Sequence, residues 1–458
     1  MAHAYKPYLW IDQYQPSAMF GSVMALSGID GVELAYHGPS GCYTIAGHIR
    51  TDQAPMGTYS AMRPSGITED NLVMGTSMDK LRQLLKFIKL ESEYARRKPK
   101  LLAVVNTDST AITGDDIVGV AKQFEKETGV PSISVDAPGF KGWDVTGYDL
   151  TFRALLTKFA KPNVAKKPDS INLIAPYLLS SQNWLFDFEG IKDLLNKLGL
   201  SINCVLTRNT KIEEIENFAA AQVNLMLTNE DLPFFTKETE KLGVPNFGAD
   251  LPLPYGLVNT EEWYAGIAAK FGKLEKAHEL LKETGKKVKR VLGFNYSYTW
   301  QSNLMMQKRA ALIGRAHFIS SMARFLYYDL DIYPEIVVLQ AASKESVDSS
   351  TQLLKSMEKD GMTVNIIVNP PYIEFARAVK SADIDFVLGS RIEKTLIEGM
   401  GIAHHSIGSS YYFNTFRYIP FPYVGYEGVL YLVQELGLAM EDMFHEREGW
   451  KGMKFKNI

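Results

Sequence analysis

The chain has 458 residues, which is too long for one compact core and predicts two to four domains. Hydrophobic residues make up 46% of it, charged residues 22%, and the net charge is -3, as in ordinary soluble globular proteins. This balance gives no sign of the clustered basic surface that nucleic-acid binding requires. The two cysteines exclude a disulfide-rich secreted scaffold and a self-contained four-cysteine metal site.

Nothing in the sequence predicts insertion into a membrane or export. Residues 1–10 lack the basic segment followed by an apolar core that marks a secretory signal. No run approaches the 18 uninterrupted apolar residues of a transmembrane helix. We therefore expect a cytoplasmic protein that does not bind membranes.

Short apolar runs alternate with helical segments along most of the chain. In the first third, strands are expected at 101–105 and 132–135, with a helix over 115–127 between them. In the middle third, strands are expected at 171–175, 201–206 and 221–227, and the segment 243–245 continues the same pattern. Helices are expected over 188–198 and 260–284, and the second of them ends at the Gly-Lys-Lys of 285–287. The last third predicts strands at 309–314, 335–339, 364–368 and 386–390, and helices over 316–330 and 428–436.

Strands separated by helices of this kind indicate βαβ crossovers and parallel sheets. The lysine-rich stretch 161–169 marks a boundary, and the alternation divides the chain into three units, over 1–165, 166–290 and 291–458. We therefore expect an α/β protein of three Rossmann-like domains, whose ligands bind beyond the carboxyl ends of strands. The chain has neither G-x-G-x-x-G after a strand nor G-x-x-x-x-G-K-[ST], so nothing indicates that it binds a dinucleotide or ATP itself.

Cys42 is the residue that bears most directly on function. It ends the sequence His-Gly-Pro-Ser-Gly-Cys, which begins at His37 after an apolar stretch. A thiol on a glycine-flanked turn suits an iron–sulfur ligand, because the backbone can approach a bulky inorganic group there. An isolated cysteine is, however, more often a small packed thiol, and a cluster normally takes four thiolates. Either Cys42 is an ordinary thiol, or another chain supplies the missing ligands.

Asp108, Ser109 and Thr110 follow the strand at 101–105, at the kind of strand end where sites gather. They are either neighbours of a group bound at Cys42 or residues that cap a helix and shape its turn. Asp115 or Asp116 can likewise cap the helix that follows.

Other candidates are weaker. Cys204 lies in an apolar strand and is expected in the core. His404 and His405 are adjacent and point to opposite sides of an extended segment, so they chelate poorly, although one could face an interdomain cleft as a proton donor. His48 and Arg50 are expected on the helix after Cys42, where they either tune a cluster or face solvent.

Several motifs, taken in chain order, resemble those of the nitrogenase component 1 family. The H-G-x-x-G-C sequence at 37–42 is followed by Thr-Glu-Asp at 68–70 and Gly75. The segment at 114–117 is similar to the family's I-G-D-D-L, and Gly-Tyr-Glu-Gly at 425–428 resembles its late G-Y-[DE]-G turn. The resemblance spans nearly the whole chain. It implies three Rossmann-like domains around a central cleft, with Cys42 as a cluster ligand.

The chain also departs from true nitrogenase subunits, which bring three cysteines each to a shared P-cluster. The first would fall near 14–17 and the third near Asp108, and neither place holds a cysteine. Val424 stands where the nitrogenase α subunit has a histidine that ligates its active-site cofactor, and that subunit's cysteine ligand has no convincing counterpart here. The resemblance therefore implies a β-type subunit without the large catalytic cofactor.

The B-type subunit of dark-operative protochlorophyllide reductase resembles the chain in its ligand count. It gives one ligand, an aspartate, from the turn equivalent to Gly41 and Cys42, and its partner gives three cysteines to the same [4Fe–4S] cluster. By this resemblance Cys42 is the single ligand, and Gly41, Asp108 and Ser109 surround a [4Fe–4S] or P-cluster-like cluster. The extra C-terminal domain expected of that subunit has no counterpart here, so we do not predict chlorophyll synthesis.

The resemblance implies the catalytic component of an ATP-dependent two-component reductase. Its partners would be a cysteine-richer α-type subunit, in an α2β2 heterotetramer, and a separate ATP-driven iron protein that donates electrons. The missing P-loop agrees with ATP being used elsewhere. Two other classes stay open: a scaffold on which a metal cofactor is assembled, and a metal-free binding protein of related shape.

Overall fold

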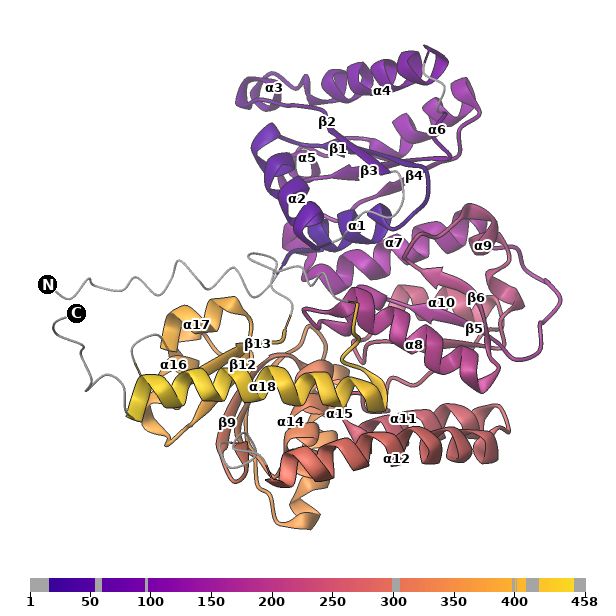
Figure 1. Cartoon of the computed structure of the whole chain (residues 1–458). Helices are drawn as coiled ribbons and strands as arrows, with labels where there is room; N and C mark the ends of the chain where they lie inside the picture. The colour runs from indigo at the N-terminus through magenta and orange to yellow at the C-terminus, as the bar shows by residue number, and fades with distance from the viewer. Residues whose placement is uncertain are drawn as a thin grey trace, which may run out of the picture.

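The computed structural model describes residues 16–53, 60–94, 98–298, 305–397, 400, 402–408 and 420–448. They form three parallel sheets that follow one another along the chain and carry helices on their faces (Figure 1). The predicted α/β class with three Rossmann-like units is therefore confirmed. The boundaries at 165/166 and 290/291 and the central cleft remain predictions.

The first sheet has the strand order β2-β1-β3-β4. Its strands are β1 (Val32–His37), β2 (Ser60–Pro64), β3 (Leu101–Asn106) and β4 (Ser132–Val135). The other elements are α1 (Ala18–Ser27), α2 (Ser40–Gln53), α3 (Glu69–Val73), α4 (Ser77–Tyr94), α5 (Asp108–Ile112), α6 (Ile117–Thr128), the 3-10 turn η3 (Gly139–Lys141) and α7 (Asp144–Phe159). The central strands β1 and β3 are buried along their whole length, as expected for a sheet covered on both faces.

The second sheet has the order β6-β5-β7-β8. Its strands are β5 (Ser170–Ile174), β6 (Ser201–Leu206), β7 (Val223–Met226) and β8 (Asn246–Phe247). The helices and 3-10 turns are η4 (Pro176–Leu179), α8 (Trp184–Leu198), α9 (Ile212–Glu216), η5 (Phe218–Ala220), α10 (Pro233–Lys241), α11 (Leu257–Lys270) and α12 (Leu274–Tyr298).

The third sheet has the order β11-β10-β9-β12-β13. Its strands are β9 (Arg309–Arg315), β10 (Tyr333–Gln340), β11 (Asn365–Val368), β12 (Phe386–Gly389) and β13 (Ala403–Ser406). The helical elements are α14 (Ala316–Leu330), α15 (Lys344–Lys355), η6 (Ser356–Asp360), α16 (Tyr372–Ser381), α17 (Arg391–Ile397) and α18 (Gly425–Glu448).

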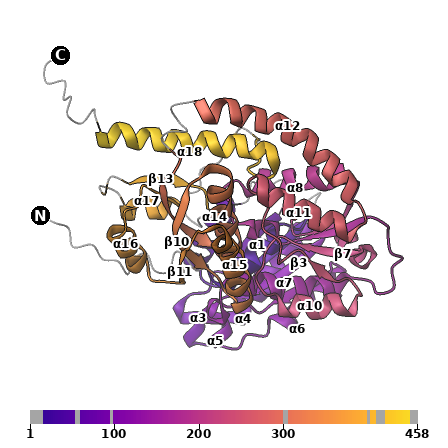
Figure 2. The ribbon, with the colours of Figure 1, turned by 90° about the horizontal axis from the view of Figure 1, so that it is seen from below.

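The two longest helices, α12 and α18, lie side by side on the outside of the molecule (Figures 1 and 2). The helix predicted over 260–284 is wrong in extent, because α11 and α12 are separate. Gly272 lies between them with φ +66°, a left-handed conformation that ends a helix. Gly285 does not end α12. A Cβ there would lie 2.9 Å from Cε2 of Tyr426, so this glycine lets α18 approach closely.

In the part of the chain described, no helix combines the length and hydrophobicity needed to cross a membrane.

The last helix is longer than the predicted range 428–436. Because α18 begins at Gly425, the Gly-Tyr-Glu-Gly motif is its first turn and does not precede it. A Cβ on Gly428 would lie 2.2 Å from the carbonyl oxygen of Tyr423. Glycine at this position therefore lets the helix fold back against the segment that leads into it.

A buried ion pair connects the first and third units. The guanidinium of Arg315, at the end of β9, binds the carboxylate of Asp144 at the start of α7, which is fully buried. Glu230 of the middle unit is also near. Burial raises its pKa, and Arg315 opposes that rise. Glu230 accepts hydrogen bonds from the backbone N–H groups of Ala342 and Ser343, both at 2.9 Å. Charged side chains from all three units thus meet in the interior.

Four asparagines, one from each strand, form a side-chain ladder across the second sheet. The amide of Asn203 donates to Asn172 Oδ1 at 3.0 Å, and that of Asn172 donates to Asn224 Oδ1 at 2.9 Å. Asn224 then donates to Asn246 Oδ1 at 2.9 Å. Asn172 and Asn224 are fully buried, and each also donates to a backbone carbonyl. The ladder therefore satisfies polar groups that would be costly to bury alone.

We expect Asn172→Leu to lower the free energy of unfolding by about 2 to 4 kcal/mol, because it leaves neighbouring amide and carbonyl groups buried without partners. Urea denaturation followed by circular dichroism measures the change. The exposed Asn196→Ala is the control and should change stability by less than about 0.5 kcal/mol. Equal effects of the two substitutions would contradict a stabilising ladder.

Candidate functional site

Cys42 lies at the carboxyl edge of the first sheet. β1 ends at His37, and α2 begins at Ser40, so the turn predicted around Cys42 is in fact the first turn of a helix. The side chain of Cys42 is exposed. A Cβ on Gly41 would meet no atom within 4 Å. The chain therefore leaves open space beside its exposed thiol.

The segments of Cys42 and Asp108 meet at a topological switch point. β1 and β3 are neighbours, and the sheet continues from them in opposite directions, to β2 and to β4. His37 is paired with Asn106 at the end of the β1–β3 ladder, and Asp108 begins α5 directly afterwards. Ligands of open α/β sheets bind outside such strand ends. The structure thus brings the two predicted segments together at the expected edge.

The two connections are in direct contact. The His37 carbonyl accepts hydrogen bonds from Thr107 Oγ1 at 3.1 Å and Thr110 Oγ1 at 3.0 Å. A Cβ on Gly38 would lie 2.3 Å from Cγ2 of Thr107, which is shorter than any real contact. Glycine at position 38 is therefore a steric requirement for this close approach.

Asp108, Ser109 and Thr110 play different parts. Thr110 Oγ1 accepts from the Thr107 N–H at 3.0 Å, so it shapes the start of α5, as the capping interpretation predicted. Ser109 Oγ lies 3.2 Å from Thr107 Oγ1. Asp108 Oδ1 instead accepts from the N–H of Phe140, in η3, at 3.3 Å. A role for Asp108 or Ser109 beside a cluster stays a prediction.

Two of the places where the family carries cysteines are close together. A Cβ on Gly139 would lie 3.0 Å from Asp108 Oδ2 and 3.2 Å from Cβ of Ser17. Ser17 is thus adjacent to Asp108 across η3. Positions 14 and 15 of the predicted 14–17 region lie outside the described residues.

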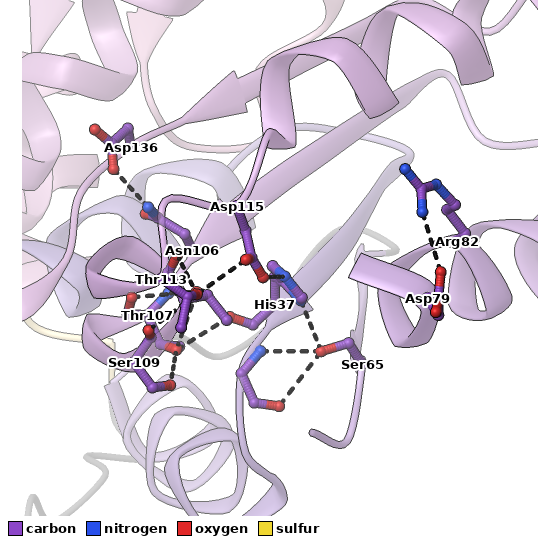
Figure 3. Close-up of polar contacts among 12 residues, drawn as sticks. His37, Ser65, Asp79, Arg82, Asn106, Thr107, Ser109, Thr113, Asp115 and Asp136 are labelled. Atoms are coloured by element: carbon purple, nitrogen blue, oxygen red, sulfur yellow. Dashed lines mark hydrogen bonds and ion pairs between the residues drawn. The ribbon is translucent and has the colours of Figure 1, made fainter. Parts of the chain in front are cut away.

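His37 supports the turn from inside the sheet. Its Nδ1 lies 2.9 Å from Ser65 Oγ and its Nε2 lies 2.7 Å from Asp115 Oδ2 (Figure 3). The Gly38 N–H donates to Ser65 Oγ at 3.1 Å. These bonds are consistent with a neutral imidazole in which Nε2–H donates to Asp115 and Nδ1 accepts from Ser65. Burial lowers the pKa of His37 and outweighs the opposing effect of Asp115.

The pKa of Asp115 is also lowered. Burial acts to raise its pKa, but hydrogen bonds from Ser77, His37 and Thr113 outweigh this, so its pKa lies below the usual value. The folded chain therefore holds His37 neutral and Asp115 ionised. Below about pH 6.5 the unfolded histidine binds a proton that the folded one does not, and near pH 4 the same holds for the aspartate. The contribution of this pair is present at neutral pH and is lost on acidification.

We expect His37→Gln to lower the free energy of unfolding at pH 7. The variant should also lose less of this free energy between pH 7 and pH 5 than the wild type does, because the histidine that resists protonation is gone. Urea denaturation across this pH range measures both effects. His278→Gln, on the exposed side of α12, is the control. A His37→Gln variant with the wild-type dependence on pH would show that His37 does not contribute to it.

The remaining candidates differ in how deeply they are buried. Cys204 is fully buried, as predicted, and burial raises its pKa. His404 on β13 has Nε2 2.9 Å from the Ser390 carbonyl, and burial lowers its pKa to about 4, so it is neutral at pH 7. His48 is exposed, whereas Arg50 is buried and donates to the Ser60 carbonyl at 2.5 Å. Arg50 therefore joins α2 to β2 and does not face solvent.

Exposed apolar side chains gather on the elements that follow the four strands of this sheet. Ile45 lies on α2, Val73 and Met74 at the end of α3, Ile112 on α5 and Phe140 in η3. They are between 48% and 80% exposed. We call these five residues the apolar rim. Exposed apolar groups of this size are removed from water when another protein covers them.

The donor set of the site is small. Within the ranges that the structure describes, no three His, Cys, Asp or Glu side chains lie together as a metal site. The exposed thiol and the space at Gly41 fit a cluster carried at the surface. The chain offers one thiolate there, so a four-ligand cluster needs ligands from another chain.

Comparison with known proteins identifies the family. Residues 17–440 match the family model of nitrogenase component 1 type oxidoreductases. The chain belongs to this family. The match confirms the resemblance seen in the motifs and covers most of the chain.

Similar proteins in the family have different roles. One is the nitrogenase iron-molybdenum cofactor biosynthesis protein NifE of Clostridium pasteurianum, 24% identical, with 84% of this chain and 79% of the relative aligned. Another is the B-type subunit of the light-independent protochlorophyllide reductase of Jannaschia sp., 22% identical over 91% of this chain and 75% of the relative. The nitrogenase molybdenum-iron protein beta chain of Methanococcus maripaludis is 22% identical over 94% of both.

A solved structure described as nitrogenase Cp1 at pH 6.5 has the same fold. The TM-score is 0.77 with 18% identity, and the match covers 97% of this chain and 96% of the other. At this identity the likeness supports the fold alone.

The position of the α-subunit histidine is filled by packed side chains in this family member. Val424 is buried, and its Cγ2 lies 2.7 Å from where a Cβ on Gly190 would be. Nearby Asp187 accepts from the N–H of Tyr423 at 2.6 Å and the hydroxyl of Tyr255 at 3.0 Å, and burial raises its pKa to about 6. The side chain of Val424 offers no metal ligand.

Proposed function

We propose that the chain is a β-type subunit of the catalytic component of a nitrogenase-like, ATP-dependent two-component reductase. Cys42 supplies one ligand to an iron–sulfur cluster, [4Fe–4S] or P-cluster-like, that a cysteine-richer α-type partner shares. The observation that carries the proposal is the exposed thiol of Cys42 at the β1–β3 switch point. Gly41 leaves the space. We expect Asp108 and Ser109, on the connection after the neighbouring strand β3, to lie beside the cluster.

Such a cluster accepts and donates single electrons when it is bound. The chain's own part is to hold its thiolate in place and to present a surface to the partner. In this proposal two copies of each subunit form an α2β2 heterotetramer in the cytoplasm, and a separate ATP-driven iron protein delivers the electrons.

The apolar rim supports a protein partner at this edge. Val73, Met74 and Ile112 are each more than 70% exposed in the isolated chain. Covering such side chains contributes roughly 25 cal/mol for each Å² of apolar surface removed from water. A partner that completes the cluster at Cys42 would also bury part of the rim.

We expect Cys42→Ala to remove most of the iron and sulfide from the complex purified with its partner, together with the EPR signal of the reduced cluster, because one of the thiolates is lost. The matched control is Cys204→Ala, which deletes the other, fully buried thiol and should keep the iron. Cys42→Ser is a poorer test, since an oxygen could replace the sulfur. Full iron content in Cys42→Ala would contradict the ligand assignment.

A second candidate function is a scaffold on which a metal cofactor is assembled and passed on. The similarity to the cofactor biosynthesis protein NifE over 84% of the chain favours it. An assay of the complex reconstituted with its partner and the iron protein distinguishes the reductase from the scaffold. Turnover of a small substrate supports the reductase, whereas transfer of a bound metal cofactor to an acceptor protein without turnover supports the scaffold.

A further inference from the structure

Tyr36 is a buried tyrosine at the carboxyl edge of the first sheet, where Cys42 also lies. It is the penultimate residue of β1 and is fully buried. Among the described residues, the one hydrogen-bond partner of its hydroxyl is Sδ of Met19, at 2.7 Å. A thioether is a weak acceptor, and buried hydroxyls normally have a stronger one. The O–H group of Tyr36 therefore donates only to a weak acceptor within the described part of the chain.

The hydroxyl of Tyr36 is within electrostatic reach of both site segments. Burial raises the pKa of Tyr36, and negative charge on Cys42 and on Asp108 raises it further. The phenol thus keeps its proton at any physiological pH. Its ring also packs edge-on against Tyr43, the residue after Cys42, with 6.2 Å between centroids. Tyr36 is therefore held from two sides close to the place where the cluster would be bound.

We propose that Tyr36 is a positioning residue whose O–H group turns from Met19 toward a sulfur of the cluster held at Cys42. This inference rests on the proposed function. A thiolate or cluster sulfide carries negative charge and is a stronger acceptor than a thioether. Hydrogen bonds to cluster sulfurs help to set the reduction potential, because they stabilise the more negative, reduced state. Tyr36 would thus raise the potential of the shared cluster.

The test compares three variants of the complex purified with its partner, each analysed for iron and sulfide and titrated to its midpoint potential by EPR. Tyr36→Phe keeps the ring and removes the donor, so it should retain the iron and shift the midpoint potential to a more negative value. Met19→Leu removes the competing acceptor and should shift the potential the opposite way. Tyr264→Phe is the control, because it removes an equivalent hydroxyl that donates to the Leu194 carbonyl at 2.9 Å in the middle unit.

Wild-type potentials in both Tyr36→Phe and Met19→Leu, with full iron, would overturn the role of Tyr36. If Tyr36→Phe fails to assemble, Met19→Leu decides, and an unshifted potential there also overturns it. A complex that keeps all its iron in Cys42→Ala would instead overturn the proposed function, so the two failures are distinguishable.

Discussion

The contact between the connection after β1 and the connection after β3 is the constraint on which the candidate site depends. Thr107 occupies the space that a side chain at position 38 would need, and two threonine hydroxyls bind the His37 carbonyl. This fixes where α2 starts and therefore where Cys42 stands relative to α5. The backbone position at Cys42 thus follows from contacts of Thr107 and Thr110 with the segment 37–38. A site arranged in this way is preorganised, because the chain adopts its geometry as it folds.

Some polar side chains of this protein are buried, and some large apolar ones are exposed. In the interior, charged groups from three units meet at Arg315, and asparagines join the strands of the second sheet. At the carboxyl edge of the first sheet, large apolar side chains face outward. Buried polar networks make the packing specific when every member has a partner. Exposed apolar groups are costly for a chain alone and are removed from water by association. Both features suit the proposed role of the chain as one subunit of a complex.

Part of the fold could be predicted because some segments carry a strong local pattern. β4, β6 and α14 have the predicted bounds, since each is a clear apolar or amphipathic run between turn residues. The region 260–284 could not be predicted in the same way. Gly272 ends a helix in a left-handed conformation, whereas Gly285 lies within a helix and packs against Tyr426. A glycine that permits close packing looks the same in sequence as one that ends a helix.

The candidate site, too, was predictable from the sequence only in part. The sequence by itself determined the α/β class, the motif around Cys42, and the count of thiols that requires a partner for any four-cysteine cluster, because these depend on residue identity and on periods of a few residues. Only the tertiary structure decided that Ser17 adjoins Asp108, that Arg50 is buried, and that Tyr36 packs against Tyr43, the residue after Cys42. It also decided which edge of the sheet carries the apolar rim. These relations join residues far apart in the chain, and they depend on the order of strands in the sheet. Local periodicity carries no record of that order.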